Sequence, residues 1–417
     1  MKYEAHSHHE LPHVVKFSGG RSSGLMLFLL LESGVLNAER GDVVVFNNTS
    51  TEHPRTYDFT MRCKEIVEGK YGIPFFWIEF QTYEDARSGT WVRIPSYRLV
   101  QSIPESAECP DGYHWRGEVY EELLSFTGFV PNLFHRTCTS HLKLETTRTF
   151  LKDWFACQSG IERLGHYGKT SRLNHDDMYE HHLKNKGSVP KHIYLAKKAF
   201  VRSRPVSRPD QQYERFAKAF KQVSNEYLVE KRIGNRAQLG EDGVEYLAFV
   251  GLRSDEMRRV TKVRKRNSGG PHSVGYEGEH VYLPLSDIGI TSQDIDDFWN
   301  EQDWNLELDP DDGLSNCTYC FLKGLNKLKR VHSVLSEELD QELENTPCDI
   351  RWWVNLERKY GRDLTAENRK VRNAEGDDFI GFFGNNRFTY ETLSTAEKEN
   401  TDLSAFESSI LPCDCTD

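Results

Sequence analysis

The sequence predicts an α/β protein with a doubly wound, mostly parallel sheet. Two short apolar runs, 14–17 and 43–46, each lead into a stretch of helical character, and a third apolar run follows at 75–80. Strands that alternate with helices typically form a parallel sheet with helices on both faces. With 417 residues, the chain is long enough to bury a large core and to contain two or three structural units.

The loop after the first strand has the composition of a phosphate-binding turn. It consists of Ser18, Gly19, Gly20, Arg21, Ser22 and Ser23. The glycines let the backbone approach an anion, while the hydroxyls, the arginine and the free N–H groups that begin the next helix are donors. The pattern matches neither Gly-x-x-x-x-Gly-Lys-Ser/Thr nor Gly-x-Gly-x-x-Gly, so the fingerprints of the usual nucleoside triphosphatases and dinucleotide-binding proteins do not apply.

The second strand runs into a polar segment, 47–56, which includes Thr49 and Glu52. Ligands of doubly wound sheets bind at the carboxyl ends of the strands, so this segment and the serine-rich loop are expected at one site. We expect a helix from about 54 to 71. Residues 81–135 contain several prolines and tryptophans and predict an irregular lid.

The second half of the chain divides into an insert and a return to the sheet. Residues 156–243 read as a mainly helical insert, and the stretch 151–243 has 18 basic and 11 acidic residues, against a net charge of −11 for the whole chain. This excess predicts either a surface for a nucleic acid, such as tRNA or DNA, or a solvated helical face. The sheet resumes at 245–250 and is followed by Arg253 and Asp255, and a helix with a good capping sequence starts at Thr291.

These features predict four regions. They are a nucleotide-binding half at 1–155, the basic insert at 156–243, the remainder of the α/β domain at 244–330, and a C-terminal helical region with a cysteine tail at 331–417. The chain has no run of eighteen apolar residues, and its start does not read as a signal peptide. We therefore expect a cytoplasmic protein without a membrane partner.

The nine cysteines predict thiols or metal ligands rather than a disulfide framework. The spacing of Cys317 and Cys320 suits zinc, an iron–sulfur cluster or a redox dithiol. Cys138 and Cys415 would complete a set of four thiolates for a 4Fe–4S cluster; structural zinc and plain thiols stay open. Cys348 and Cys413 are alternative fourth ligands. Lys143 lies near Cys138 in the sequence and would attract an anionic substrate.

Several motifs resemble those of one superfamily. The loop at 18–23 resembles the PP-loop, usually written Ser-Gly-Gly-x-Asp-Ser, of the ATP pyrophosphatases (adenine nucleotide alpha hydrolase-like) and the phosphoadenosine phosphosulfate (PAPS) reductase family. The segments 47–56, 251–256 and 281–299 are similar to further motifs of that family, and Arg136 to Lys143 looks like its cluster-binding or substrate-facing segment. Together the resemblance covers about 13–155 and 244–330. Ser22 stands where the family has aspartate, and Ser50 where it has glycine.

This resemblance implies an enzyme that binds ATP, or a PAPS-like adenine nucleotide, with Mg²⁺. Bound pyrophosphate would leave when a substrate oxygen attacks the α-phosphorus, and sulfide from a cysteine, an open cluster iron or a sulfur donor protein would then displace AMP. The implied catalytic residues are Arg21, Lys143 and Cys138, the first two by stabilising charge. The implied nucleotide-binding residues are Ser18, Gly19, Gly20, Arg21, Ser22, Ser23, Thr49, Glu52, Arg253 and Asp255.

Two other functions stay open. The first is a PAPS reductase in which a cysteine attacks the sulfonyl sulfur, although the Glu-Cys-Gly-Leu/Ile-His tail of those enzymes is absent from the sequence. The second is a non-catalytic nucleotide-sensing module that acts on a partner through the basic insert. Release of pyrophosphate from ATP separates the enzyme from the sensor.

Overall fold

The computed structural model describes residues 8–85, 92–132, 135–157, 180, 183–184, 232–233, 236–267, 277–363, 379–384 and 388–399. Most of the predicted insert at 156–243 lies outside these residues. The same holds for Cys413 and Cys415, so the predicted fourth thiolate of the metal site has no described position.

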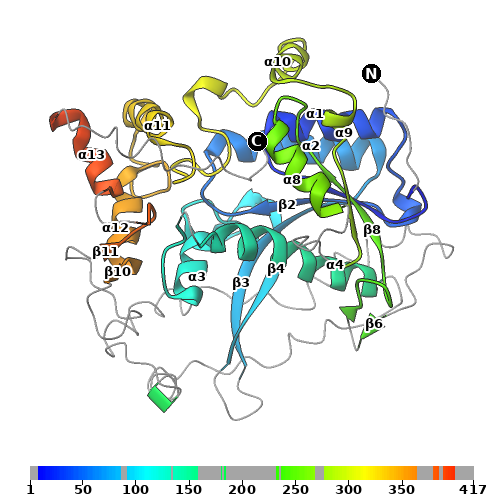
Figure 1. Ribbon diagram of the computed structural model, residues 1–417, viewed down its shortest axis with the longest axis horizontal. Coiled ribbons are helices and arrows are strands. Elements are labelled where there is room, and N and C mark those ends of the chain that lie inside the picture. Colours follow the sequence, from blue (N-terminus) through cyan, green and yellow to red (C-terminus); the bar gives the residue numbers. More distant parts are fainter. Residues whose placement is uncertain are drawn as a thin grey trace.

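A seven-stranded sheet forms the centre of the protein, with the strand order β5-β4-β3-β2-β1-β8-β9 (Figure 1). Its strands are β1 (His13–Phe17), β2 (Val43–Asn48), β3 (Phe75–Asp85), β4 (Val92–Pro104), β5 (Gly112–Tyr113), β8 (Tyr246–Val250) and β9 (Glu279–Tyr282). All neighbouring pairs are parallel except β3 and β4. The predicted α/β class with a mostly parallel sheet is therefore confirmed.

Helices cover both faces of this sheet, as Figure 1 shows. On one face, α1 (Arg21–Glu32) and α2 (Pro54–Tyr71) pack on side chains such as Val15 and Phe46. On the other face, α4 (Thr146–Cys157) packs on Val14 and its neighbours. Because β1 and β2 are buried on both sides, their sequences are mostly apolar instead of alternating, and the lysine in β1, Lys16, pairs with Glu279.

The chain changes direction across the sheet at β1. The strands β2 and β3 follow on one side of β1, whereas β8 lies on its other side. Such a reversal opens a crevice at the carboxyl ends of the two strands that flank it, and ligands of doubly wound folds bind there. The loop after β1 and the segment after β8 both lie at this edge of the sheet, where Arg253 contacts Ser22.

The region 81–135 is more regular than the sequence predicted. β4 pairs with β3 from Val92 to Val100, and α3 (Glu118–Thr127) follows. Two features made β4 difficult to predict from the sequence. Pro95 and Pro104 are unusual in strands, and the charge of Arg98 is neutralised inside the protein by Glu79, 3.1 Å away.

The remaining elements surround the sheet. They are η1 (Ala38–Arg40), η2 (Cys138–Glu145), α8 (Met257–Asn267), α9 (Pro284–Asp287), α10 (Ser292–Asn300), η4 (Pro310–Asp312), α11 (Leu325–Glu338), α12 (Ile350–Tyr360), α13 (Tyr390–Glu399) and the short pairs β6 (Arg232–Ile233) with β7 (Arg236–Ala237) and β10 (Arg362–Asp363) with β11 (Phe379–Ile380). The predicted cap of the helix at 291–299 is confirmed, because Thr291 and Asp294 form a reciprocal capping box.

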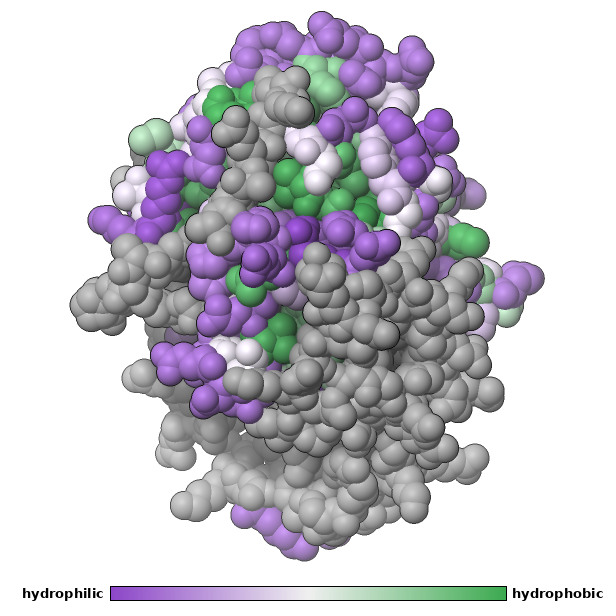
Figure 2. Space-filling model, turned by 90° about the vertical axis from the view of Figure 1, so that its right-hand side faces the viewer, coloured by the Kyte–Doolittle hydropathy of each residue, from purple (hydrophilic) through white to green (hydrophobic). Residues whose placement is uncertain are grey.

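The surface of the described part is predominantly hydrophilic on the side where β8 lies in Figure 1, with smaller hydrophobic areas between the polar side chains (Figure 2). Among the described residues, no helix combines the length and the apolar character that a membrane span requires.

A buried carboxyl group joins the C-terminal elements. The Glu357 side chain on α12 accepts hydrogen bonds from the backbone N–H groups of Phe382, at 2.9 Å, and Tyr390, at 2.8 Å. Burial raises the pKa of Glu357 to about 8, although both hydrogen bonds oppose the shift. The folded state therefore holds a proton that the unfolded state loses above the ordinary glutamate pKa of 4.5.

This proton makes stability depend on pH. We expect the contribution of Glu357 to be complete below pH 4.5 and to disappear as the pH rises through about 8. The free energy of unfolding should fall by about 3 to 5 kcal/mol across that window. Urea unfolding at several pH values measures it, with Glu357→Gln as the test and Glu65→Gln, an exposed carboxyl on α2, as the control. Equal pH slopes for wild type and Glu357→Gln would contradict this assignment.

Candidate functional site

The loop between β1 and α1 has the backbone of an anion-binding turn. Gly19 has φ +81°, a left-handed conformation, and a Cβ atom there would lie 2.7 Å from Thr56 Cγ2. Gly20 occupies the N-cap position and has no side chain that could occupy the N–H groups of the first turn of α1. That turn also contains no acidic residue. The positive end of the helix dipole is thus open to an anion.

The serines of the loop have different roles. Ser23 is fully buried, and its hydroxyl donates to the Gly20 carbonyl at 2.8 Å while it accepts from the Ser18 N–H at 3.2 Å and lies 3.0 Å from the Ser18 hydroxyl. These bonds close the loop on itself. Ser22 points the other way, and its hydroxyl oxygen accepts from Arg253 Nη1 at 3.1 Å.

Arg253 follows β8, the strand beside β1, and reaches the loop from there. Asp255 orients its guanidinium through a 3.1 Å contact with Nε, and the second Asp255 oxygen accepts from the Ser292 N–H at 3.2 Å. Partial burial opposes ionisation of Asp255, but Arg253 and the hydrogen bonds to Ser292 outweigh it and hold its pKa below the ordinary value. Asp255 is therefore a carboxylate at neutral pH.

Arg21, the first residue of α1, is held on the outer side of the loop. Its Nη2 forms an ion pair with Asp296 on α10 at 3.0 Å, and its carbonyl accepts from the Trp299 indole at 2.9 Å. A guanidinium carries five N–H donors, so this pairing leaves capacity for a phosphate oxygen. The structure thus brings the predicted residues 18–23, Arg253 and Asp255 together at the carboxyl ends of β1 and β8.

The segment after β2 is ordered by its own side chains. The Glu52 carboxylate accepts from Thr49 Oγ1 at 2.5 Å, from the Thr51 N–H at 3.1 Å and from the Tyr57 hydroxyl at 3.1 Å. Ser50 adopts φ +59°, and its N–H donates to Asn48 Oδ1 at 2.8 Å. A left-handed conformation is costly for a residue other than glycine, and the hydrogen bond to Asn48 helps to stabilise it at Ser50.

Three predicted cysteines line one pocket beside that segment. Cys317 Sγ lies 3.6 Å from Thr49 Oγ1, and the Thr318 N–H donates to the Thr51 carbonyl at 2.9 Å, which ties the Cys317–Cys320 loop to the end of β2. Cys138 begins η2, a π-helical segment of the kind that is frequent at functional sites. The pocket is lined by Thr49, Tyr120, Cys138, Thr139, Leu142, Lys143, Cys317, Cys320, Phe321, Leu322 and Trp353.

This pocket offers the donors of an iron–sulfur or zinc site but little space. Three half-buried cysteine thiols, none of which is in a disulfide, are soft ligands of the required kind. The volume between the side chains is about 20 Å³, enough for one water molecule. Within the described ranges, no group of three or more His, Cys, Asp or Glu side chains has the geometry of a metal site. A cluster would therefore require the side chains that line the pocket to rearrange.

Two tyrosines near the thiols, Tyr120 and Tyr390, were not predicted from the sequence. Burial and the neighbouring cysteines raise the pKa of Tyr120 and Tyr390 well above the ordinary value, so both phenols stay protonated beside the thiols. Neither residue stands in a motif. Cys348, proposed as an alternative ligand, is not among the residues that line the pocket. Burial raises its pKa to about 12, so it remains a thiol.

A buried charge network supports the turn at Thr49 from behind. One oxygen of Glu79 faces Arg98 Nε at 3.1 Å and His114 Nδ1 at 2.6 Å. The other oxygen accepts from Asn48 Nδ2 at 2.8 Å. Because Asn48 also holds the N–H of Ser50, this network fixes the backbone that presents Thr49. Arg98 and His114 belong to the region that the sequence predicted as irregular, so nothing in the sequence linked them to the site.

No family model, no curated protein and no solved structure matches this chain.

Proposed function

We propose that this protein is a PP-loop enzyme of the PAPS reductase type. It binds ATP, or a related adenine nucleotide, with Mg²⁺ and cleaves the bond between the α- and β-phosphates to adenylate a substrate for sulfur transfer. The observation that supports it is the loop at 18–23, which lies where the strand order reverses at β1. Arg253, which follows the neighbouring strand β8, donates a hydrogen bond to Ser22 in this loop.

The loop suits pyrophosphate as a leaving group. Backbone N–H groups of the first turn of α1, with Arg21 and Arg253, hold the β- and γ-phosphates and leave the α-phosphorus open. A substrate oxygen attacks that phosphorus, the bond to the bridging oxygen breaks, and pyrophosphate departs with the electron pair while the substrate loses its proton. Stabilisation of the developing charge is the main contribution of the protein. Asp255, the carboxylate beside Arg253, would hold Mg²⁺ on the pyrophosphate.

The cysteine pocket suits the sulfur step. Cys138, Cys317 and Cys320 would hold a 4Fe–4S cluster, or alternatively zinc, with Cys415 as the proposed fourth ligand. A bound cluster supplies an iron to which sulfide can bind. Lys143 lines the same pocket and attracts the anionic adenylate. The ends of β1 and β2 are neighbours in the sheet, which brings the thiols and the phosphate loop to one edge.

A nucleic acid, tRNA or DNA, is the substrate class that the charge distribution favours. Arg258, Lys262 and Lys265 are exposed on α8, which follows Arg253 directly. Their positive charge beside the phosphate loop would attract a polyanion. The insert at 156–243, with its basic excess, extends this proposal outside the described residues.

Reduction of PAPS is a second candidate, because a half-exposed thiol, Cys138, lines one pocket with Lys143. Thiol attack on the sulfonyl sulfur would release the adenosine 3′,5′-bisphosphate, and a second thiol would then release sulfite as the disulfide forms. Sulfite from PAPS, without pyrophosphate from ATP, would favour this candidate over the first.

Arg253 provides a direct test of nucleotide binding. We expect Arg253→Met to weaken Mg²⁺–ATP binding by about tenfold to a hundredfold, because a charge-assisted hydrogen bond to phosphate contributes about 1.5–3 kcal/mol. Isothermal titration calorimetry measures the affinity. Arg264→Met is the matched control, since Arg264 is an exposed arginine on α8 that pairs with Asp287 at 3.1 Å. Equal losses in the two variants, or no binding by the wild type, would contradict the proposed site.

A further inference from the structure

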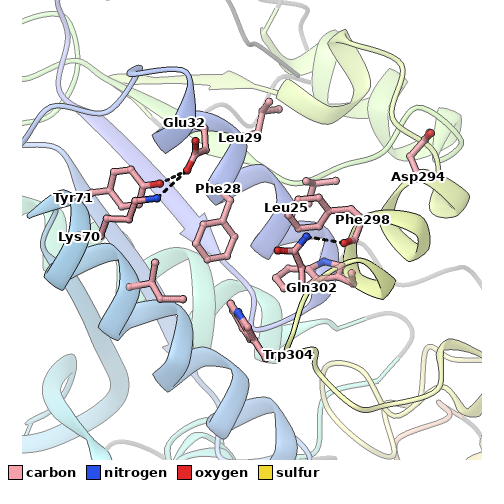
Figure 3. A pocket seen from close by; sticks show the side chains of 12 residues that line it. Leu25, Phe28, Leu29, Glu32, Lys70, Tyr71, Asp294, Phe298, Gln302 and Trp304 are labelled. Atoms are coloured by element: carbon pink, nitrogen blue, oxygen red, sulfur yellow. Dashed lines mark hydrogen bonds and ion pairs between the residues drawn. The ribbon is translucent and has the colours of Figure 1, made fainter.

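A second pocket lies on the outer side of the helices that cover the sheet. It is formed by α1, α2, α10 and the segment that follows α10, and its volume is about 580 Å³ (Figure 3). Pockets of about 300–1,000 Å³ are the usual size of small-molecule sites. Neither the proposed phosphate loop nor the cysteine pocket includes any of its lining residues.

The walls of this pocket are aromatic. Phe28, Phe298, Trp299 and Trp304 surround it together with Leu25, Leu29 and Ile66. The Trp299 and Trp304 rings are 5.2 Å apart, and Phe28 lies 6.0 Å from Trp304, both in edge-to-face arrangements. Such rings offer faces and edges to another planar ring.

The polar groups at the rim define the charge of the ligand. Glu32 pairs with Lys70 at 3.3 Å and also accepts from the Tyr71 hydroxyl. Asp294 is bound by the capping box with Thr291. The charged residues of the lining are two carboxylates and one lysine, and that lysine is already paired with Glu32. The lining therefore offers no cation to an anionic ligand, and its apolar walls suit a molecule without charge.

One rim residue offers a hydrogen-bond acceptor. The Gln302 amide nitrogen donates to the Phe298 carbonyl at 3.1 Å, which fixes the orientation of the amide. Figure 3 shows the amide oxygen on the other side, turned toward the pocket. A ring N–H of a ligand would be its natural partner.

The floor of the pocket is connected to the phosphate loop. Trp299 donates to the Arg21 carbonyl at 2.9 Å, and Asp296 on the same helix pairs with the Arg21 guanidinium at 3.0 Å. The absence of a side chain at Gly24 lets the Trp299 ring lie against α1, because a Cβ atom there would be 2.6 Å from Trp299 Cζ2. A ligand that shifts Trp299 would therefore also shift Arg21.

We propose that this pocket binds a neutral, planar heteroaromatic molecule with a ring N–H, no larger than a nucleoside, and that its occupancy alters nucleotide binding through Trp299 and Arg21. The coupling rests on the proposed ATP site, whereas binding of the heteroaromatic ring does not. By linkage, the nucleotide would change the affinity for the ring by the same factor.

Indole and 1-methylindole are suitable probes, because a methyl group in 1-methylindole replaces the hydrogen of the ring N–H donor. We expect indole to bind the nucleotide-free protein about fivefold more tightly than 1-methylindole, and Gln302→Met to remove this difference. Gln302 is exposed, so the substitution leaves the fold intact. Saturation-transfer NMR titrations measure both affinities. No binding of indole to the folded wild type, or a preference that survives Gln302→Met, would overturn the site.

A filled pocket provides an independent check. Ile66 is half-buried on α2 and lines the pocket, so Ile66→Trp should abolish indole binding while Glu65→Trp, on the exposed side of the same helix, should not. Indole binding to folded Ile66→Trp would overturn the assignment.

Calorimetric titration of ATP with and without saturating indole tests the coupling: a changed affinity supports it, and an unchanged affinity overturns it. Wild-type protein that binds indole but no ATP would instead count against the proposed function.

Discussion

Replacing Gly19 with alanine is expected to reduce ATP binding at least about a hundredfold while the protein remains folded. The new Cβ atom would lie 2.7 Å from Thr56 Cγ2, 3.1 Å from Thr60 Oγ1 and 3.2 Å from the Phe46 ring. Alanine is also less favourable than glycine in the left-handed backbone conformation at this position, where φ is +81°. The loop must shift to relieve these contacts, which moves the N–H groups of α1 away from the phosphates.

Gly289 is the matched control for this substitution. It has the same φ of +81°, but a Cβ atom there would have no neighbour within 4 Å. Gly289→Ala should therefore show the conformational cost alone and keep ATP binding. Calorimetry with Mg²⁺–ATP and thermal unfolding of both variants separate binding from stability. Wild-type affinity in folded Gly19→Ala would contradict the role of the loop.

Replacing Cys317 with serine is expected to remove bound iron. Anaerobically prepared wild type should be brown with about four irons per chain, and Cys317→Ser should lose most of them because a serine oxygen is a poor ligand for iron in a cluster. We expect the same loss for Cys320→Ser and Cys138→Ser, since all three thiols line one pocket.

Cys109 provides the control for the cysteine series. It is also half-buried and not in a disulfide, but its thiol lies 3.7 Å from Asp111 Oδ1 and does not line the cysteine pocket, so Cys109→Ser should keep the iron. Metal analysis of the purified proteins gives the readout. Stoichiometric zinc in place of iron would mean that these cysteines bind zinc and not an iron–sulfur cluster. Equal metal content in wild type and Cys317→Ser would contradict the site altogether.

The sequence predicted the parallel core well because its signals are local. The apolar runs at 14–17 and 43–46 are buried strands, and the glycine and serine residues between 18 and 23 form the turn that their small size predicts. The gathering of Cys138 with Cys317 and Cys320 was predicted from the spacing of the latter two and from the resemblance of the segment around Cys138 to a cluster-binding segment.

Features that depend on distant partners were not predictable in this way. Arg98 reads as a surface residue until Glu79, 19 positions earlier, neutralises it inside the protein. The pairing of Arg21 with Asp296 joins residues from opposite ends of the domain. No motif distinguishes Trp299 and Trp304 in the sequence, and only their arrangement around α1 and α2 reveals a pocket.

The products formed from ATP test the central claim most directly. Anaerobically purified protein would be incubated with Mg²⁺–ATP, sulfide and a mixture of tRNA and DNA, and the phosphates followed by ³¹P NMR. We predict AMP and pyrophosphate in equal amounts, absent from the Gly19→Ala control and retained with Gly289→Ala. ADP with inorganic phosphate, or ATP left intact under all of these conditions, would contradict cleavage between the α- and β-phosphates at this loop.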